Sequence, residues 1–169
     1  LTLTGAGYGI NRGDLNITDD LAIVGTVGVG IDGAGGSVTD RVFSIKPRTA
    51  GSFITVTMQD LEIFAGSTAS NGGCVYVQSA SLALTDVSVT GCTTQKNGGG
   101  IYFDGRLATS ALTMSGGRIL GNTATLSGGG IYVTAGTASL SGVAVSGNTT
   151  ALSGGGIFNR RSFGVATSL

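Results

Sequence analysis

The carboxylates are the side chains of this sequence best suited to acid–base chemistry, and few of them lie close together. Asp60 and Glu62 are two residues apart, and Asp19 is followed directly by Asp20. A pair of carboxylates acts as general acid and base only where the two groups converge across a cleft, whereas neighbouring side chains of one strand diverge. Aspartates at turns commonly hydrogen-bond the backbone. We therefore expect structural roles for these residues and for Asp86.

The other groups that could support catalysis or ligand a metal are scarce. The sequence has no histidine, which excludes histidine-based catalytic triads and histidine-ligated metals. Two cysteines without histidine are a poor metal site, and the glycine-rich calcium repeat is not matched, so calcium would have to be held by scattered aspartates. We expect no enzyme, no cofactor and no metal site.

Charge and hydropathy exclude further classes of protein. Charged residues make up 11% of the chain and balance to a net charge of zero, without the basic stripe that a nucleic-acid partner would require. No apolar run approaches the length of a membrane span, and no signal peptide is recognisable. The chain does not begin with methionine, so we expect a processed form or a piece of a longer protein.

A block of three glycines followed by Ile and an aromatic residue organises the elements of the chain. The block recurs as NGGGIYF from Asn97, SGGGIYV from Ser127 and SGGGIF from Ser153, with a looser NGGCVYV from Asn71. The starts are 26, 30 and 26 residues apart in chain order, a period typical of solenoid repeats.

Each repeat contains short segments with alternating apolar residues, separated by corners rich in Gly, Ser, Thr and Asn, which predicts strands. Aligned coils place Leu82, Leu84, Val87 and Val89 where a later coil has Ala138, Leu140, Val143 and Val145. The coil from Asn97 fits if four residues are inserted within 104–110. The same alignment places Asp60 at a corner and Glu62 in an outward column continued by Ser88, Arg118 and Ala144.

The predicted fold is all-β: a single-domain right-handed parallel β-helix over residues 1–169, with about three strands per coil and about six coils. The usual hand of parallel crossovers favours the right-handed form, as does the family resemblance given below. Within this domain we expect irregular coils over 1–70, regular coils over 71–159, and a worn or truncated end over 160–169.

Two families show a resemblance to these patterns. Residues 13–43, followed by GGGIY coils that end in SGN, resemble the β-helix surface proteins that carry the CSLREA domain, although the cysteine-bearing motif of that domain is absent. The later coils resemble the polymorphic outer-membrane-protein repeat, with its glycine block and a strand that ends in Asn, here Gly99–Ile101 with Asn122 and Gly129–Ile131 with Asn148. Both resemblances imply a secreted or surface-displayed protein with a structural or adhesive role.

An aromatic column is the most prominent expected surface feature. If Ile101, Ile131 and Ile157 face inward, the aromatic residue after each of them faces outward at one angular position. The column comprises Tyr76, Tyr102, Tyr132 and Phe158. The rings could stack and stiffen the solenoid, or they could form an apolar platform for sugars or a cell-surface partner. The inverse orientation, with the rings inside, also remains open.

Three further groups of residues are candidates for specific roles. Asn122 and Asn148 are expected to form a buried amide ladder. Cys74 and Cys92 fall in one coil and are either small buried hydrophobic residues or a disulfide, the latter in an oxidising compartment. The inserted segment is expected to protrude as an exposed loop that offers Asp104 and Arg106 for a contact.

The functional hypothesis is an extracellular or cell-surface protein that adheres or assembles into fibres. Solenoid coils present unpaired backbone groups at their ends, and residues 119–159 contain no charged side chain to discourage stacking. Expected partners are further copies of the chain, or a glycan or cell-surface partner. The alternative is a glycan-binding module or a polysaccharide-active enzyme that uses one face of the helix. An Arg-Gly-Asp tripeptide at 12–14 matches an integrin-binding motif, but a match of three residues is common by chance.

Overall fold

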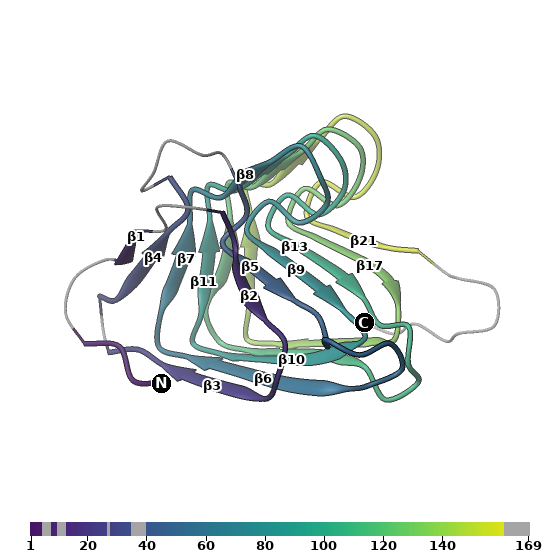
Figure 1. Cartoon of the computed structure of the whole chain (residues 1–169). Helices are drawn as coiled ribbons and strands as arrows, with labels where there is room; N and C mark the ends of the chain where they lie inside the picture. The colour runs from purple at the N-terminus through teal and green to yellow at the C-terminus, as the bar shows by residue number, and fades with distance from the viewer. Residues whose placement is uncertain (5–7, 10–12, 27, 35–39, 161–169) are drawn as a thin grey trace.

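The structure is a computed structural model that describes residues 1–4, 8–9, 13–26, 28–34 and 40–160. The chain forms a parallel β-solenoid of about five turns with a period of about 26 residues (Figure 1). The predicted fold class is therefore confirmed, whereas the expected number of about six coils is slightly too high. No helix in the described part of the chain has the length and hydrophobicity to cross a membrane.

Four parallel sheets, rather than the predicted three, run along the solenoid. Sheet A contains β3 (Leu21–Val24), β6 (Ile54–Gln59), β10 (Ala80–Thr85), β14 (Ala111–Ser115) and β18 (Thr137–Ser141). Sheet B contains β1 (Tyr8–Gly9), β4 (Gly30–Asp32), β7 (Glu62–Phe64), β11 (Ser88–Thr90), β15 (Arg118–Leu120) and β19 (Ala144–Ser146).

The other two sheets carry the repeat block and the segment that precedes it. Sheet C contains β2 (Leu15–Ile17), β5 (Phe43–Ile45), β9 (Val75–Gln78), β13 (Ile101–Asp104), β17 (Ile131–Ala135) and β21 (Ile157–Asn159). Sheet D contains β8 (Ser67–Thr68), β12 (Thr93–Thr94), β16 (Thr123–Ala124) and β20 (Thr149–Thr150). The strands of sheet D have two residues each, too short to show an alternating pattern, which is why three strands per coil were predicted.

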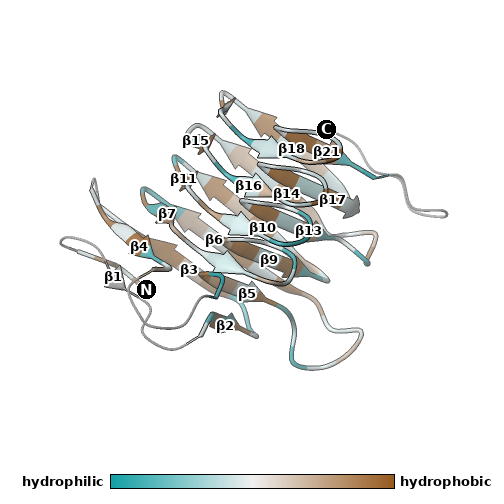
Figure 2. Ribbon diagram, turned by 90° about the horizontal axis from the view of Figure 1, so that it is seen from above, coloured by the Kyte–Doolittle hydropathy of each residue, from teal (hydrophilic) through white to brown (hydrophobic). Residues whose placement is uncertain are grey.

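The core consists of apolar columns that run from coil to coil. Leu82 pairs with Val56 and Leu112, and Leu112 in turn pairs with Ala138. In sheet B, Val89 lies between Ile63 and Ile119. These columns match the sequence alignment, and their side chains are almost completely buried in the middle coils. The hydrophobic bands cross the strands of successive coils in Figure 2.

The corner between sheets A and B has a left-handed backbone. Asp60 and Asp86 have φ angles of 54° and 51°, and the equivalent Gly116 and Gly142 have 69° and 65°. Asp and Gly are among the residue types that adopt this conformation most readily. The predicted corner positions of Asp60 and Asp86 are thus confirmed.

The inserted segment also lies where the alignment predicts it. Ser79 alone separates β9 from β10, and Gly136 alone separates β17 from β18, whereas residues 105–110 separate β13 from β14. Arg160 is the last described residue, and its N–H donates a hydrogen bond to the Val133 carbonyl. The remainder of the predicted worn end, and the first residue of the Arg-Gly-Asp tripeptide, lie outside the described residues.

The three-glycine block permits the closest approach between coils. Gly98 has a φ of 71°, which favours glycine, and its neighbour Gly99 packs directly against the next coil. A Cβ atom on Gly99 would lie 2.1 Å from the Gly129 carbonyl oxygen, far inside van der Waals contact. Both positions therefore require glycine, each for a different reason.

We expect Gly99→Ala to lower the free energy of unfolding by about 2 kcal/mol, because the backbone of the next coil must move to admit the methyl group. Gly155→Ala is the matched control, since the nearest atom to its Cβ lies at 3.2 Å, and it should cost about 0.5 kcal/mol or less. Urea titration followed by circular dichroism measures both values. Equal losses in the two variants would contradict the role assigned to the block.

Candidate functional site

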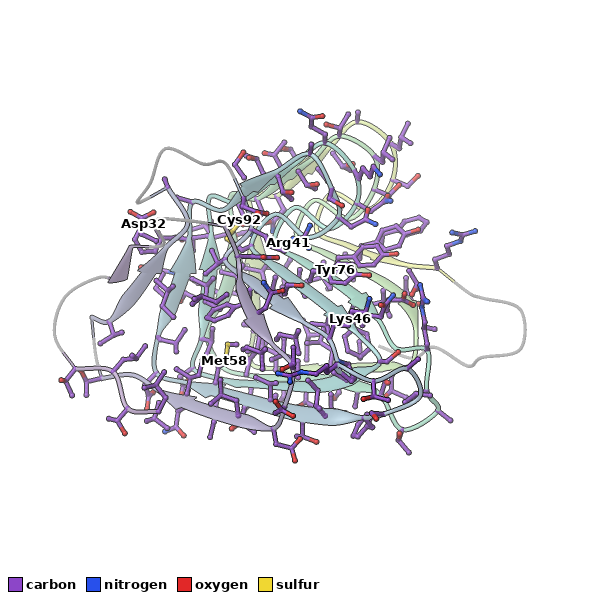
Figure 3. All side chains as sticks on the ribbon, in the orientation of Figure 1. Asp32, Arg41, Lys46, Met58, Tyr76 and Cys92 are labelled. Carbon is purple, nitrogen blue, oxygen red and sulfur yellow. A yellow bond between two sulfur atoms is a disulfide. The ribbon has the colours of Figure 1, made fainter. Side chains whose placement is uncertain are left out.

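The aromatic column lies on the outer face of sheet C, where in-register pairing brings the four rings together (Figure 3). Adjacent ring centroids are 5.4 Å apart for Tyr76 and Tyr102, 5.3 Å for Tyr102 and Tyr132, and 5.1 Å for Tyr132 and Phe158. The ring planes are nearly parallel, with angles of 2°, 8° and 19° along the series. Tyr132 is buried, and the other three rings are half-buried.

Stacking decides which part of each ring a ligand can reach. Because the faces of the inner rings contact one another along the solenoid axis, the column presents ring edges to its surroundings. A sugar packs its C–H bonds against the face of an aromatic ring, and the outer face of Tyr76 is already covered by the Arg41 guanidinium at 5.2 Å. The geometry therefore favours the stiffening interpretation over the apolar platform.

The phenol groups of this column have perturbed acidity. Burial, followed by the negative charge of Asp104, raises the pKa of Tyr102 from 10.0 to about 12. The pKa of Tyr76 is also raised, mainly by burial and then by Asp104, while Arg106 and Arg41 act in the opposite direction. Both hydroxyls thus remain neutral donors at any physiological pH.

Asp104 differs from the expectation of an exposed loop acid. Its carboxylate is buried and accepts hydrogen bonds from Arg106 Nε at 2.7 Å, Thr134 Oγ1 at 2.8 Å and Gln78 Nε2 at 3.3 Å. Thr134 is an extra residue of β17, because Phe103 pairs with Val133 and Asp104 with Ala135. The bulge supplies one of the partners that satisfy the carboxylate in its buried position.

Arg106 does protrude as predicted, with a side chain that is 62% exposed. Its hydrogen bond with Asp104, and then the charge of that carboxylate, raise the pKa of the guanidinium. The predicted exposure is therefore wrong for Asp104 and confirmed for Arg106, while a contact made by this loop stays a prediction. Sequence reasoning could not place Asp104, because Gln78 and Thr134, two of its three partners, come from strands in the preceding and following coils.

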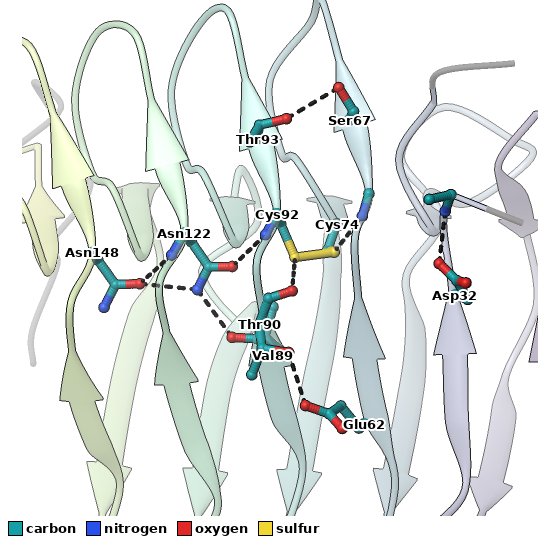
Figure 4. Close-up of a disulfide and its surroundings, with 12 residues drawn as sticks. Asp32, Glu62, Ser67, Cys74, Val89, Thr90, Cys92, Thr93, Asn122 and Asn148 are labelled. Carbon is teal, nitrogen blue, oxygen red and sulfur yellow. Dashed lines mark hydrogen bonds between the residues drawn. A yellow bond between two sulfur atoms is a disulfide. The ribbon is translucent and has the colours of Figure 1, made fainter. Parts of the chain in front are cut away.

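The two asparagines form the expected ladder inside the solenoid (Figure 4). Asn148 Oδ1 accepts from the backbone N–H of Asn122 at 3.0 Å and from its Nδ2 at 2.9 Å. Asn122 in turn accepts from the Cys92 N–H at 2.9 Å and donates to the Val89 carbonyl. Asn122 is fully buried, so each of these bonds satisfies a group that water does not reach.

Cys92 occupies the ladder position of the preceding coil and is bonded to Cys74 in a disulfide. The pair is completely buried within the core cluster. The disulfide thus continues the asparagine ladder by a covalent link at the point where the amide side chains end. Of the two alternatives for these cysteines, the structure contains the disulfide.

The remaining carboxylates serve mainly as backbone caps and ion pairs. Asp20 Oδ1 accepts from the Thr55 N–H at 2.7 Å, which caps the start of β6. Glu62 accepts from Thr90 Oγ1 at 2.8 Å and lies 3.6 Å from Arg118, two coils further along the predicted column. Asp60, Glu62 and Asp86 border one open groove with Arg118, but no described residues form a cluster of three or more potential metal ligands.

Arg41 is a residue that sequence reasoning missed. It covers Tyr76 and forms an ion pair with Asp14 at 3.6 Å. Arg41 lies just before β5, and Ser44 of β5 pairs with Tyr76, so the aromatic column ends at Tyr76. This position is the only signal in the sequence that Arg41 could cover the last ring. That signal requires the register between two coils, which the irregular sequence of residues 13–43 hides.

A comparison with known proteins finds one short similarity. Residues 118–134 match the repeat of the Chlamydia polymorphic membrane proteins. This segment runs from β15 to β17 and contains Asn122 and the block Gly129–Ile131, two of the marks that suggested the resemblance. Neither a curated protein nor a solved structure matches the chain, and the resemblance to CSLREA-domain proteins remains a prediction.

We expect Asn122→Ala to lower the free energy of unfolding by about 3 kcal/mol, because it removes the acceptor of the buried Cys92 N–H and the amide bonds to the Val89 carbonyl and to Asn148. Thr123→Ala, which removes an exposed hydroxyl bonded to Thr149, should cost less than about 1 kcal/mol. Urea titration measures both changes. A loss in Thr123→Ala as large as that in Asn122→Ala would contradict the ladder's role.

The raised pKa of Tyr102 predicts a loss of stability at alkaline pH. The phenol has a pKa of 10.0 in the unfolded chain and of about 12 in the folded one, so the folded state binds more protons at pH values between these two. Stability should therefore fall as pH rises through this window. Tyr102→Phe keeps the ring in the stack and should weaken this dependence. An ultraviolet difference titration of wild type against Tyr102→Phe measures the pKa, and a midpoint near 10 would contradict the prediction.

Proposed function

We propose that this chain is a structural and adhesive segment of an extracellular or cell-surface β-solenoid. The observation that carries the proposal is the set of uninterrupted ladders along the axis: the apolar columns, the asparagines and the stacked aromatic rings. Such ladders make a stiff scaffold whose outer faces and loops can vary without disturbing the core. A stiff scaffold suits the display of a contact surface away from a cell.

Two findings support an extracytoplasmic location. The chain holds a buried disulfide, and disulfides persist mainly in oxidising compartments. The matched repeat comes from proteins described as membrane proteins of Chlamydia. Together they favour a protein exposed outside the cytoplasm.

Self-association is the second part of the proposal. In the described residues β18, β19, β20 and β21 each end a sheet, so their outer backbone groups have no strand beside them. Such edges pair either with further coils of the same protein or with another copy. Residues 119–159, which contain these strands, carry no charge that would oppose stacking.

Catalysis is not part of the proposal. The groove beside Asp60, Glu62 and Asp86 is the feature that would favour the polysaccharide-active alternative. However, the Glu62 carboxylate is engaged by Thr90 and Arg118, and the two aspartates lie at the left-handed corners between sheets A and B. We propose that the groove forms because the chain turns at these corners, and that it is not a catalytic site.

The test is to coat beads with purified chain and measure their adhesion to intact animal and bacterial cells. We expect saturable adhesion that soluble folded chain competes away and that reduced, alkylated chain does not. Electron microscopy over a concentration series should show end-to-end rods. Release of reducing or unsaturated sugar ends from a polysaccharide panel would overturn the non-catalytic proposal, and the absence of adhesion to every cell type would overturn the adhesive one.

A further inference from the structure

A second groove lies on the side of sheet C where the inserted segment protrudes. It has a volume of about 380 Å³, within the range of small-ligand sites. Its walls are the loop 46–53, which follows β5, and the inserted loop 105–110, which follows β13. Two loops from coils that are not neighbours thus border one cavity, with Gln78 and Ser79 of the intervening coil between them.

The charges in this groove have one sign. Lys46 and Arg106 line it, and among the described residues no acidic side chain does. The Asp104 carboxylate beside Arg106 is buried and accepts hydrogen bonds from Arg106 Nε, Gln78 and Thr134. Lys46 and Arg106 together outnumber this one carboxylate, so the groove keeps a net positive charge, although the chain as a whole has none. Such a surface complements an anion.

The pairing of Arg106 with Asp104 orients the guanidinium for a ligand. The bond to Asp104 uses Nε, and the exposed side chain leaves its two Nη groups for a second partner. A guanidinium held at one edge presents a planar fork that matches the two oxygens of a carboxylate or sulfate group. Asp104, held by the β17 bulge, is in this sense a positioning residue for Arg106.

The rest of the lining favours a sugar over a peptide. Thr49, Ser52, Gln78 and Ser79 offer hydroxyl and amide groups, which can both donate to and accept from sugar hydroxyls. Pro47 and Leu107 supply small apolar contacts. The lining is thus mostly polar with a small apolar part, which suits a ligand rich in hydroxyl groups.

We propose that the groove between loops 46–53 and 105–110 binds an acidic sugar, with Lys46 and Arg106 holding its carboxylate or sulfate group. The site deepens the proposed adhesive function, on which it rests, by naming the chemistry of the partner. It also assigns a role to the insertion, which lengthens this coil relative to its neighbours. The stacked tyrosines do not line the groove.

The experiment measures binding of purified full-length chain to immobilised polymers in matched pairs. Polygalacturonate is compared with its methyl ester, and dextran sulfate with dextran. The acidic member of at least one pair should bind, its neutral counterpart should not, and binding should weaken with added salt. The pair that responds identifies the group as carboxylate or sulfate. Binding of neutral polymers as strong as that of acidic ones would overturn the proposal.

Variants test the two cations. Lys46→Gln and Arg106→Gln should each weaken binding about ten-fold, because each loses a charge-assisted contact. Arg118→Gln is the control, since it removes one positive charge from an exposed side chain of sheet B. Because Arg106 also pairs with Asp104, Lys46→Gln separates ligand binding from loop support. Equal loss of binding in Arg118→Gln would show diffuse charge attraction and overturn the site.

Two further comparisons complete the design. Poly-glutamate binding as tightly as the acidic polysaccharides would overturn the sugar assignment. The Lys46→Gln, Arg106→Gln double variant is then tested in the bead assay, with circular dichroism to check its fold. Cell adhesion equal to wild type, together with no binding to any acidic polymer, would overturn the groove and leave the adhesive proposal intact. Absence of adhesion by the wild-type chain would instead defeat the adhesive proposal itself.

Discussion

Close approach of successive coils at the three-glycine block is the constraint on which the rest of this structure depends. At Gly99 the backbone of one coil lies so near the next that no side chain fits, and the N–H of Gly99 donates to the Gly128 carbonyl. This contact repeats in each regular coil and fixes the register of the strands that follow. Once the register is fixed, like side chains in successive coils must lie directly above one another.

The ladders are consequences of that register, and each one ends in a different way. The asparagine ladder changes into a disulfide at Cys92, and the aromatic column ends at Tyr76 beneath the Arg41 guanidinium. Both changes occur where the regular coils meet the irregular N-terminal ones. A buried amide or a ring face needs a partner on both sides, and where the repeat pattern stops a different group supplies it.

The clearest departure from the repeat in the regular coils lies in a loop, which the register of the strands does not control. The insertion after β13 is accommodated by a bulge in β17, which contributes Thr134 to the buried carboxylate of Asp104. The loop then projects Arg106 toward the loop that follows β5. A solenoid can acquire such a site without repacking its core, because each coil contacts only its neighbours.

The sequence by itself determined the solenoid, its period, the apolar columns, the corner positions of Asp60 and Asp86, and the ladder positions of Asn122 and Asn148. All of these follow from local alternation and from a repeat that can be aligned. Only the tertiary structure decided the fourth sheet, the burial of Asp104, the edge-outward stacking of the tyrosines, and the position of Arg41. The physical reason is that two-residue strands carry no periodicity, and that burial and ring orientation depend on side chains from other coils, which the alignment pairs but does not place in space.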